Sequence, residues 1–269
     1  SLDGGQTWSL PVAVVPRAAN DQSLDDVIID RSGHIHAVWV DSVLANDEDA
    51  AALAYARSED QGRTWSTPRT VDNSICSCCG TRLVEHGDGA LSVLYRDQRP
   101  RDMLVSETRD AGARWQSRGH AGAFGWQFDG CPETVSGFAR DGAVLFATVW
   151  TGMPGRQGLY AVKTTDDGQS WHRPVKLTDG IAKASDLSVV NQTVVSAVWS
   201  EVLDDGVMAI AYSRSEDRAE TWRTPTILQQ SRTALLSSPR IATTPRGQMI
   251  FWIEENGSTA RLLTAFVAF

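Results

Sequence analysis

The segment Ser58-Glu59-Asp60-Gln61-Gly62-Arg63-Thr64-Trp65 decides the fold, because its octapeptide pattern returns along the chain. The pattern, S/T-x-D-x-G-x-T/S-W, recurs at spacings of roughly 50 to 57 residues, as expected of a repeat architecture. The carboxylate of its aspartate can accept hydrogen bonds from turn amides, and its glycine can adopt a positive φ. Its tryptophan can pack between neighbouring sheets. The five copies end at Trp8, Trp65, Trp115, Trp171 and Trp222. We therefore predict a structural role for Asp3, Asp60, Asp110, Asp166 and Asp217.

The segments between these copies predict strands. Before Trp65, alternating or apolar runs cover residues 27–30, 34–41 and 52–56, and residues 68–71 follow it. Four strands per repeat of this length are typical of a propeller blade, and no segment requires a helix. We predict an all-β protein, a β-propeller of four-stranded blades with the octapeptide at turns. It forms one domain over residues 1–269.

The two ends of the chain leave the blade count open. The chain begins inside one copy of the octapeptide and stops after the third strand of a repeat. One arrangement is a closed five-bladed ring, in which the N-terminal strand completes the last blade and removes both open edges. The other is a six-bladed propeller that lacks its first strands.

Composition excludes two classes of function. The 269 residues carry a formal net charge of −8, and lysine and arginine are scattered rather than clustered. A nucleic-acid groove needs a clustered basic face, so we expect no nucleic-acid partner. No apolar run approaches the roughly 20 residues of a spanning helix, so we expect no membrane insertion.

The five repeats resemble the Asp boxes of the sialidase-like BNR-repeat propeller family. A narrower resemblance is to a secreted bacterial subgroup with C-x-C-C, R-D-I/M and W-x-x-x-G-C-P motifs. Here these motifs are Cys76-Ser77-Cys78-Cys79, Arg101-Asp102-Met103 and Trp126-Gln127-Phe128-Asp129-Gly130-Cys131-Pro132. The resemblance implies a periplasmic or secreted protein.

Sialidase catalysis finds little support in the sequence. The resemblance implies three arginines, a Tyr–Glu nucleophile pair and an Asp, with the first arginine in an early R-I-P motif. That motif is absent, and its nearest relative, Pro239-Arg240-Ile241-Ala242, lies in the wrong blade. The last tyrosine is Tyr212, which shares a strand position with Tyr55 and Tyr160 that indicates packing. Whether the chain is an enzyme stays open.

The face opposite the boxes carries the candidate site residues, because loops on a rigid β scaffold favour binding. Two positions after the second-strand aromatic, four blades carry an acid and the fifth carries Gly152. These acids are catalytic or cation-binding candidates, or simply solvated strand ends. They are Asp41, Asp97, Glu201 and Glu254, of which we take the last three as catalytic candidates. The ligand-binding candidates are Arg82, Arg96, Trp126 and Arg240.

All four cysteines of the chain are expected on that same face. Blade periodicity places Cys131 beside the group of Cys76, Cys78 and Cys79. The favoured interpretation is a disulfide from that group to Cys131. The alternative is a thiolate site for copper or zinc, with His86 or His120 nearby, and no other cofactor is expected.

The function predicted from the sequence is binding of a glycan or protein ligand on the cysteine-bearing face of an extracytoplasmic propeller. Two alternatives stay open. One is an exo-sialidase-like glycoside hydrolase with an altered active site. The other is a copper- or zinc-handling protein that uses the cysteines.

Overall fold

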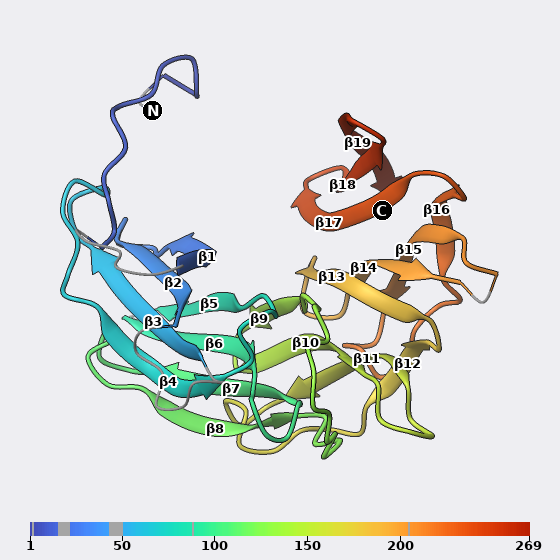
Figure 1. Ribbon diagram of the computed structural model, residues 1–269, viewed down its shortest axis with the longest axis horizontal. Helices are drawn as coiled ribbons and strands as arrows, with labels where there is room; N and C mark the ends of the chain where they lie inside the picture. The colour runs from blue at the N-terminus through green and yellow to red at the C-terminus, as the bar shows by residue number, and fades with distance from the viewer. Residues whose placement is uncertain (2, 16–21, 43–50, 88, 204) are drawn as a thin grey trace.

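The computed structural model describes residues 1, 3–15, 22–42, 51–87, 89–203 and 205–269. The regular structure of these residues consists of strands in five antiparallel sheets. The sheets follow one another in chain order round an arc, with the first strand of each sheet nearest its centre, like the blades of a propeller (Figure 1). In the part of the chain described, no helix could cross a membrane.

Four sheets have four strands each, and the last has three. The first sheet holds β1 (Gln22–Ile29), β2 (Ile35–Asp41), β3 (Ala51–Ser58) and β4 (Arg69–Ile75). The second holds β5 (Arg82–Gly87), β6 (Ala90–Arg96), β7 (Met103–Thr108) and β8 (Gln116–Ala121). The third and fourth hold β9 (Phe138–Asp141), β10 (Val144–Thr151), β11 (Gly158–Thr164), β12 (Val175–Thr178), β13 (Ile181–Val189), β14 (Val195–Val202), β15 (Met208–Ser215) and β16 (Thr226–Ser231). The last holds β17 (Leu235–Thr244), β18 (Gly247–Asn256) and β19 (Thr259–Ala268).

The second and third strands of the first four sheets are buried at nearly every position, because a sheet or its loops cover both of their faces. All residues of β7 and β11 are buried, for example, whereas β4 and β16 on the outside are largely exposed. Four of the five core clusters of the described residues join two neighbouring sheets, as where Val38 and Tyr55 pack with Leu91 and Tyr95. Side chains that interdigitate between sheets therefore set the order of the blades.

Each octapeptide forms the same turn. In the second copy, Asp60 accepts the amide of Thr64 at 2.8 Å and its hydroxyl at 2.7 Å, and Ser58 donates its hydroxyl to Asp60. The copies around Asp3, Asp166 and Asp217 repeat this arrangement, and in the copy around Asp110 the amide and the Nε of Arg114 are the donors. Ala219, which replaces glycine, still adopts a φ of 64°. The repeated residues thus satisfy the turn amides of one end of the sheets.

The two ends of the chain do not close the arc among the described residues. The first sheet and the last sheet lie on either side of an opening in Figure 1. Trp8 is 78 % exposed, and Val14 and Val15 pack against the first sheet rather than against β19. The strand exchange expected for a closed five-bladed ring is therefore not shown.

Candidate functional site

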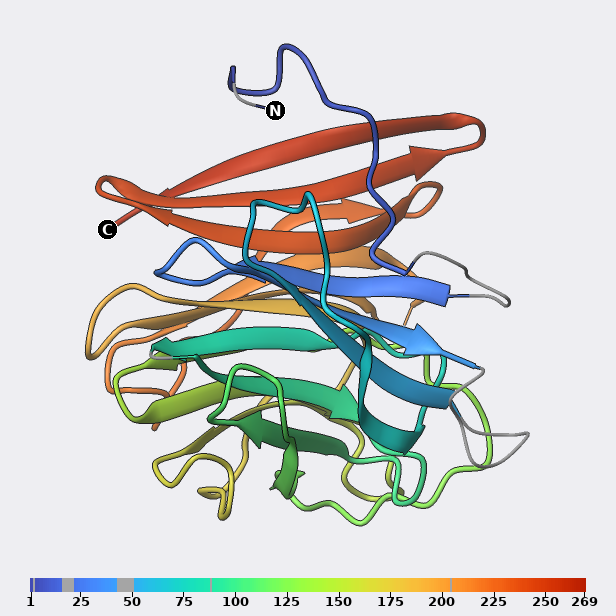
Figure 2. The same cartoon turned by 90° about the vertical axis from the view of Figure 1, so that its left-hand side faces the viewer.

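Seen from the side, the strands of the sheets are joined by loops at both of their ends (Figure 2). Because the strands alternate in direction, the Asp boxes share one end, which we call the box face. The links between blades and the turns between second and third strands share the other end. We call this end the cysteine face, defined by residues 76–81, 97–102 and 122–137.

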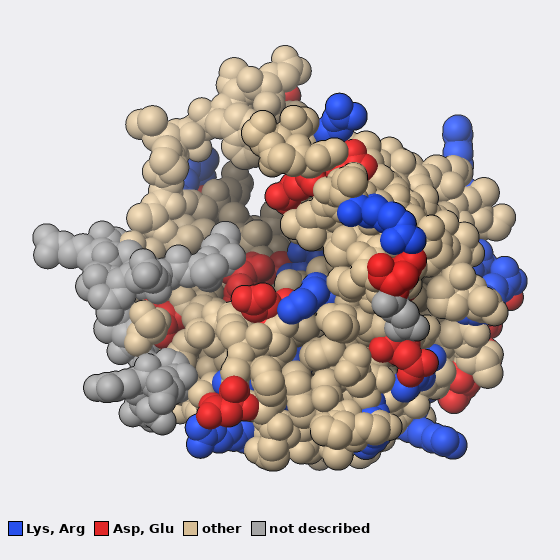
Figure 3. Space-filling view, turned by 45° about the vertical axis from the view of Figure 1, so that its right-hand side comes forward, with Lys and Arg blue, Asp and Glu red and all other residues tan. Residues whose placement is uncertain are grey.

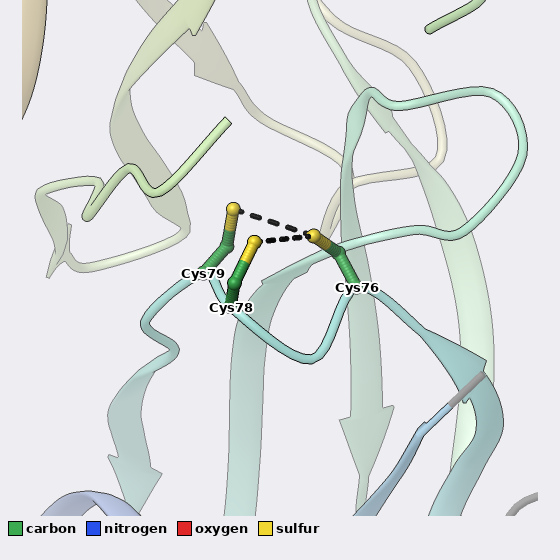
Figure 4. A group of neighbouring side chains, drawn as sticks. All are labelled: Cys76, Cys78 and Cys79. Atoms are coloured by element: carbon green, nitrogen blue, oxygen red, sulfur yellow. Dashed lines mark hydrogen bonds between the residues drawn. The ribbon is translucent and has the colours of Figure 1, made fainter. Parts of the chain in front are cut away.

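A disulfide joins two links of the cysteine face. Cys78 is bonded to Cys131 with a Cα–Cα distance of 6.1 Å and a sequence separation of 53 residues. The predicted bridge from the cysteine group to Cys131 is thereby confirmed. Cys76 and Cys79 are free and buried, and the Sγ of Cys76 lies 3.5 Å from the Sγ of each of its two neighbours (Figure 4).

Arg96 is packed beside the free cysteines. Its guanidinium donates to the hydroxyl of Thr134 and the carbonyl of Trp150, both at 3.0 Å, and to the carbonyl of Arg101. The S–H of Cys76 and the charge of Arg96 lower the pKa of Cys79 to about 5, while the pKa of Cys76 is raised. Arg96, which the sequence predicted to bind a ligand, is only 1 % exposed. Its hydrogen bonds join the second and third sheets.

Trp126 is also buried in the cysteine face. Its ring stacks on Phe128 with a centroid distance of 5.0 Å and meets Trp150 edge-on at 5.4 Å. A Cβ on Gly152 would lie 2.6 Å from the Trp126 ring. The indole therefore occupies the space that an acidic side chain takes in the other blades, which explains the glycine there. Phe128, which the sequence did not single out, is 43 % exposed.

The Arg101-Asp102 motif fixes the loop that carries Trp126. Asp102 is buried and accepts the amides of Gly125 and Trp126, at 2.6 and 3.2 Å. Arg101 donates its Nε to the carbonyl of Phe128 at 3.2 Å. The motif and the tryptophan segment, far apart in sequence, thus form one rigid unit.

The three acids predicted as catalytic candidates each have a local partner. Asp97 lies 2.8 Å from the Nε2 of His120, and this contact raises the pKa of that histidine. Glu201 accepts the hydroxyl of Thr178 at 2.6 Å, and Glu254 accepts the side-chain amide of Gln229. These acids belong to three different sheets, and a catalytic role for them stays a prediction.

The two histidines expected near the cysteines make contacts of their own. Among the described residues, the sulfur group of Cys76, Cys78 and Cys79 contains no histidine. His120 is held by Asp97 as above, and His86 lies with Glu107 and Asp167. The sequence brings His86 to the end of an inner strand, where it packs toward the box of the next sheet rather than toward the cysteines.

The group around His86 links the second and third sheets by charge. Arg109 lies 2.8 Å from both Glu107 and Asp167, and Arg140 lies 3.0 Å from Asp167. Burial lowers the pKa of His86 to about 4. Because arginines surround these carboxylates, the group suits ion pairing between blades rather than a bound cation.

A second set of charged residues lies where the inner strands meet, and we call it the axial cluster. Equivalent register positions place Asp26 opposite Val38, Arg82 opposite Leu94, Asp186 opposite Val198 and Arg240 opposite Phe251. Each opposing residue comes just before the second-strand aromatic. The cluster consists of Asp25, Asp26, Arg82, Asp186 and Arg240.

Two carboxylates of the axial cluster tie one inner strand to the next. Asp26 accepts the amide of Leu83 at 2.8 Å, and Asp186 accepts the amide of Ile241 at 3.1 Å. Each accepted amide directly follows an arginine of the cluster. The same bond thus recurs between the first and second sheets and between the fourth and fifth.

One arginine of the cluster, Arg82, remains incompletely satisfied. Arg82 donates Nη1 to the carbonyl of Thr81 at 2.8 Å, but its buried Nη2 has no hydrogen-bond partner among the described residues. Burial and the charge of Arg240 lower the pKa of Arg82. Burial raises the pKa of Asp25 to about 7 and also raises that of Asp186. The positive charges of the two guanidinium groups therefore act on each other. They lie beside acids whose pKa is raised.

The axial cluster lies on the inner strands β1, β5, β13 and β17, which are nearest the centre of the arc. Figure 3 shows a hollow between the first and last sheets, with acidic and basic side chains around it. Arg82 begins β5 directly after the cysteine link. Sequence reasoning found Arg82 and Arg240 but missed the three aspartates. Aligning the inner strands on the residue before each second-strand aromatic would have found Asp26 and Asp186.

Pockets of the box face offer less to a ligand. Two of them, with volumes of about 450 and 490 Å³, lie along the box turn of the first sheet and share Thr64, Trp65 and Ser66. The polar groups of this turn already bond one another, as the contacts of Asp60 show. The unsatisfied guanidinium lies on the other face.

Fold and site define an all-β, sialidase-like protein built from Asp-box blades. The chain belongs to the family described as BNR repeat-like domain, which matches residues 1–181. Among proteins with curated descriptions, none matches this chain.

Several solved structures share the fold. The Hadza microbial sialidase Hz136 matches with a TM-score of 0.58 and 17 % identity over 99 % of this chain and 58 % of its own. The NanB sialidase from Streptococcus pneumoniae matches with a TM-score of 0.62 and 11 % identity, over 93 % of this chain and 59 % of its own. An ulvan lyase bound to a repeat of GlcA and Rha3S matches with a TM-score of 0.56 and 12 % identity, over 90 % of this chain and 64 % of its own. The chain thus spans less than two thirds of the length of these structures.

Proposed function

We propose that this chain binds an acidic saccharide on its cysteine face, with the acid group held between Arg82 and Arg240. The observation that carries the proposal is the pair of inner-strand guanidiniums, of which one has a buried nitrogen without a partner. Buried charged donors are costly to leave unpaired. A carboxylate or sulfate group accepts from two guanidiniums at once, so it would satisfy both.

A second feature of the cysteine face supports a ligand of this kind. Trp126 and Phe128 stack beside the link that enters the third sheet, and the exposed Phe128 offers an apolar surface for a sugar ring. The solved relatives include sialidases and an ulvan lyase bound to a saccharide that contains GlcA. We propose a periplasmic or secreted location, because structural disulfides persist in oxidising compartments.

Calorimetric titration with glucuronic acid and with N-acetylneuraminic acid tests the proposal, with glucose as the neutral probe. Arg240→Gln should weaken binding of the acids by at least about tenfold, since a charged hydrogen bond contributes about 1.5–3 kcal/mol. Arg246→Gln is the matched control, because Arg246 is an exposed arginine in the turn of the same hairpin. Equal binding of glucose, or unchanged binding in Arg240→Gln, would contradict the proposal.

The affinity should depend on pH through Asp25. The groups that act on Asp25 are Arg82, Asp26, Cys79 and Thr81, and burial raises its pKa to about 7. Below that pH Asp25 is neutral and leaves the arginines to the ligand. As pH rises through about 7, the new carboxylate competes for Arg82 and repels the acid, so binding should weaken.

A glycoside hydrolase with an altered active site is the second candidate, and Asp25 is the observation that favours it. A buried carboxyl that keeps its proton near neutral pH is suited to general acid catalysis. Hydrolysis of a chromogenic glycoside that disappears in Asp25→Asn would establish this activity. Loss of hydrolysis in variants of Asp97, Glu201 or Glu254 would instead support the candidates from the sequence.

A further inference from the structure

Two buried thiols lie side by side on the cysteine face and take no part in the disulfide. Cys76 and Cys79 are 2 % and 3 % exposed, and their Sγ atoms are 3.5 Å apart. Figure 4 shows both sulfurs directed toward one another from the ends of one tight loop. No contact of the axial cluster uses them as hydrogen-bond partners. They are therefore a pair of soft donors without an assigned role.

Backbone contacts hold the loop of these thiols in place. The amide of Cys76 donates to the carbonyl of Arg96 at 2.9 Å, and the amide of Gly80 donates to the carbonyl of Thr134 at 3.1 Å. The disulfide from Cys78 to Cys131 closes the loop against the link to the third sheet. The sulfur pair is thus positioned before any ion arrives, which lowers the cost of binding one.

The donor set selects among metal ions. Cys78 lies close enough to join the other two sulfurs but is bonded to Cys131, so it offers no thiolate. In the described part of the chain, no histidine or carboxylate joins this group. Structural zinc is almost always bound by four ligands, and calcium and magnesium require oxygen. Two thiolates in a dry site suit copper(I), which soft sulfur ligands select.

The local charge also fits a monovalent ion. Two thiolates and one Cu⁺ carry one net negative charge. The buried guanidinium of Arg96 lies beside this site and interacts with both cysteines. Its positive charge would balance the complex in a region from which water is excluded.

We propose that Cys76 and Cys79 bind one copper(I) ion between their sulfur atoms while the bridge from Cys78 to Cys131 stays intact. The ion enters and remains as Cu(I), so no electron transfer is involved. This site uses other residues than the saccharide site proposed at the axial arginines, although the charge of Cys79 acts on Asp25. Failure of either proposal leaves the other standing.

Transfer of Cu(I) from its bicinchoninate complex, under anaerobic conditions and without a thiol reductant, tests the proposal on the full chain. Wild-type protein should remove about one Cu(I) per chain from the chelator, as two soft thiolates permit. Cys76→Ser and Cys79→Ser should each abolish this transfer. Ser77→Ala, at an exposed residue of the same loop, is the matched control and should keep it.

Two further measurements keep the proposal falsifiable if the cysteine variants fail to fold. Alkylation of the denatured, unreduced wild-type protein should find two thiols per chain, in agreement with one bridge. X-ray absorption of the copper-loaded protein should show two sulfur neighbours. Four thiols with bound zinc, a copper site with nitrogen or oxygen ligands, or no transfer of copper would each overturn the proposal.

Discussion

The two faces of this molecule follow different rules. On the box face one pattern is built five times, and each copy makes the same bonds around its aspartate. On the cysteine face no two links are alike: one carries three cysteines, and the next carries Trp126 and Cys131. Both faces sit on the same sheets.

Residues that stabilise every blade differ from residues that form a site at one position of the molecule. A group that every blade needs is repeated, as the box carboxylates are. Gly152 departs from the acids of the other blades because Trp126 fills its space. Departures from the repeat therefore mark the site, and repeats mark the scaffold.

The largest effect is expected from removing the bridge of the cysteine face. The double variant Cys78→Ser, Cys131→Ser should lose about 4 kcal/mol of unfolding free energy by the chain-entropy estimate for a loop of this length. The bridge spans 53 residues and joins two links that no other blade connects in this way. Urea unfolding of the variant, beside wild type with and without reductant, measures the difference. Equal stability of variant and wild type would show that the bridge does not hold this face together.

Glycines of the box face should be unequal despite their identical pattern. A Cβ on Gly112 would lie 1.9 Å from Cε1 of Tyr55, whereas a Cβ on Gly62 would find its nearest neighbour, Ile35, at 3.6 Å. Gly112→Ala should therefore cost about 2–4 kcal/mol through crowding and positive φ, and Gly62→Ala only about 1 kcal/mol through φ. Thermal unfolding compares them. Similar losses in both variants would mean that packing between blades does not constrain the box.

The smallest effect concerns one box carboxylate and the pH. Hydrogen bonds from Ser170 lower the pKa of Asp166 to about 2. A lowered pKa contributes stability that is present above the ordinary carboxyl pKa and is lost as pH falls toward about 2. Asp166→Ala should lower the unfolding midpoint at neutral pH and differ less from wild type near pH 2.

Asp179→Ala is the control for that measurement, because the side chain of Asp179 is 87 % exposed and lies outside any box. Its unfolding midpoint should stay close to that of wild type at both pH values. A box variant that behaved like this control would remove the structural role of the box carboxylate.

The scaffold could be predicted from the sequence, because its signals are local and repeated. The boxes fixed the position of the third and fourth strands of each blade, and the absence of helix is confirmed for the described residues. The first strand was placed too late, at residue 27 instead of Gln22. Polar Asp25 and Asp26 interrupt its apolar pattern, and the register shifts between Leu24 and Asp26.

The site could be predicted only in part, because it depends on contacts between blades. Periodicity predicted a bridge from the group of Cys76, Cys78 and Cys79 to Cys131, but not which of the three is the partner. Arg96 was predicted to bind a ligand. The sequence does not show that the carbonyl of Trp150 in the next sheet accepts a hydrogen bond from this arginine. The axial aspartates were missed because their common register is visible only when the inner strands are aligned with their neighbours.

A crystal structure of the full chain soaked with glucuronic acid tests the central claim most directly. The carboxylate of the sugar should lie between the guanidiniums of Arg82 and Arg240. It should be within hydrogen-bond distance of the Nη2 of Arg82, which now lacks a partner among the described residues. A sugar bound only in the grooves around Trp65 on the box face, or an axial cluster that stays without ligand at saturating sugar, would contradict it.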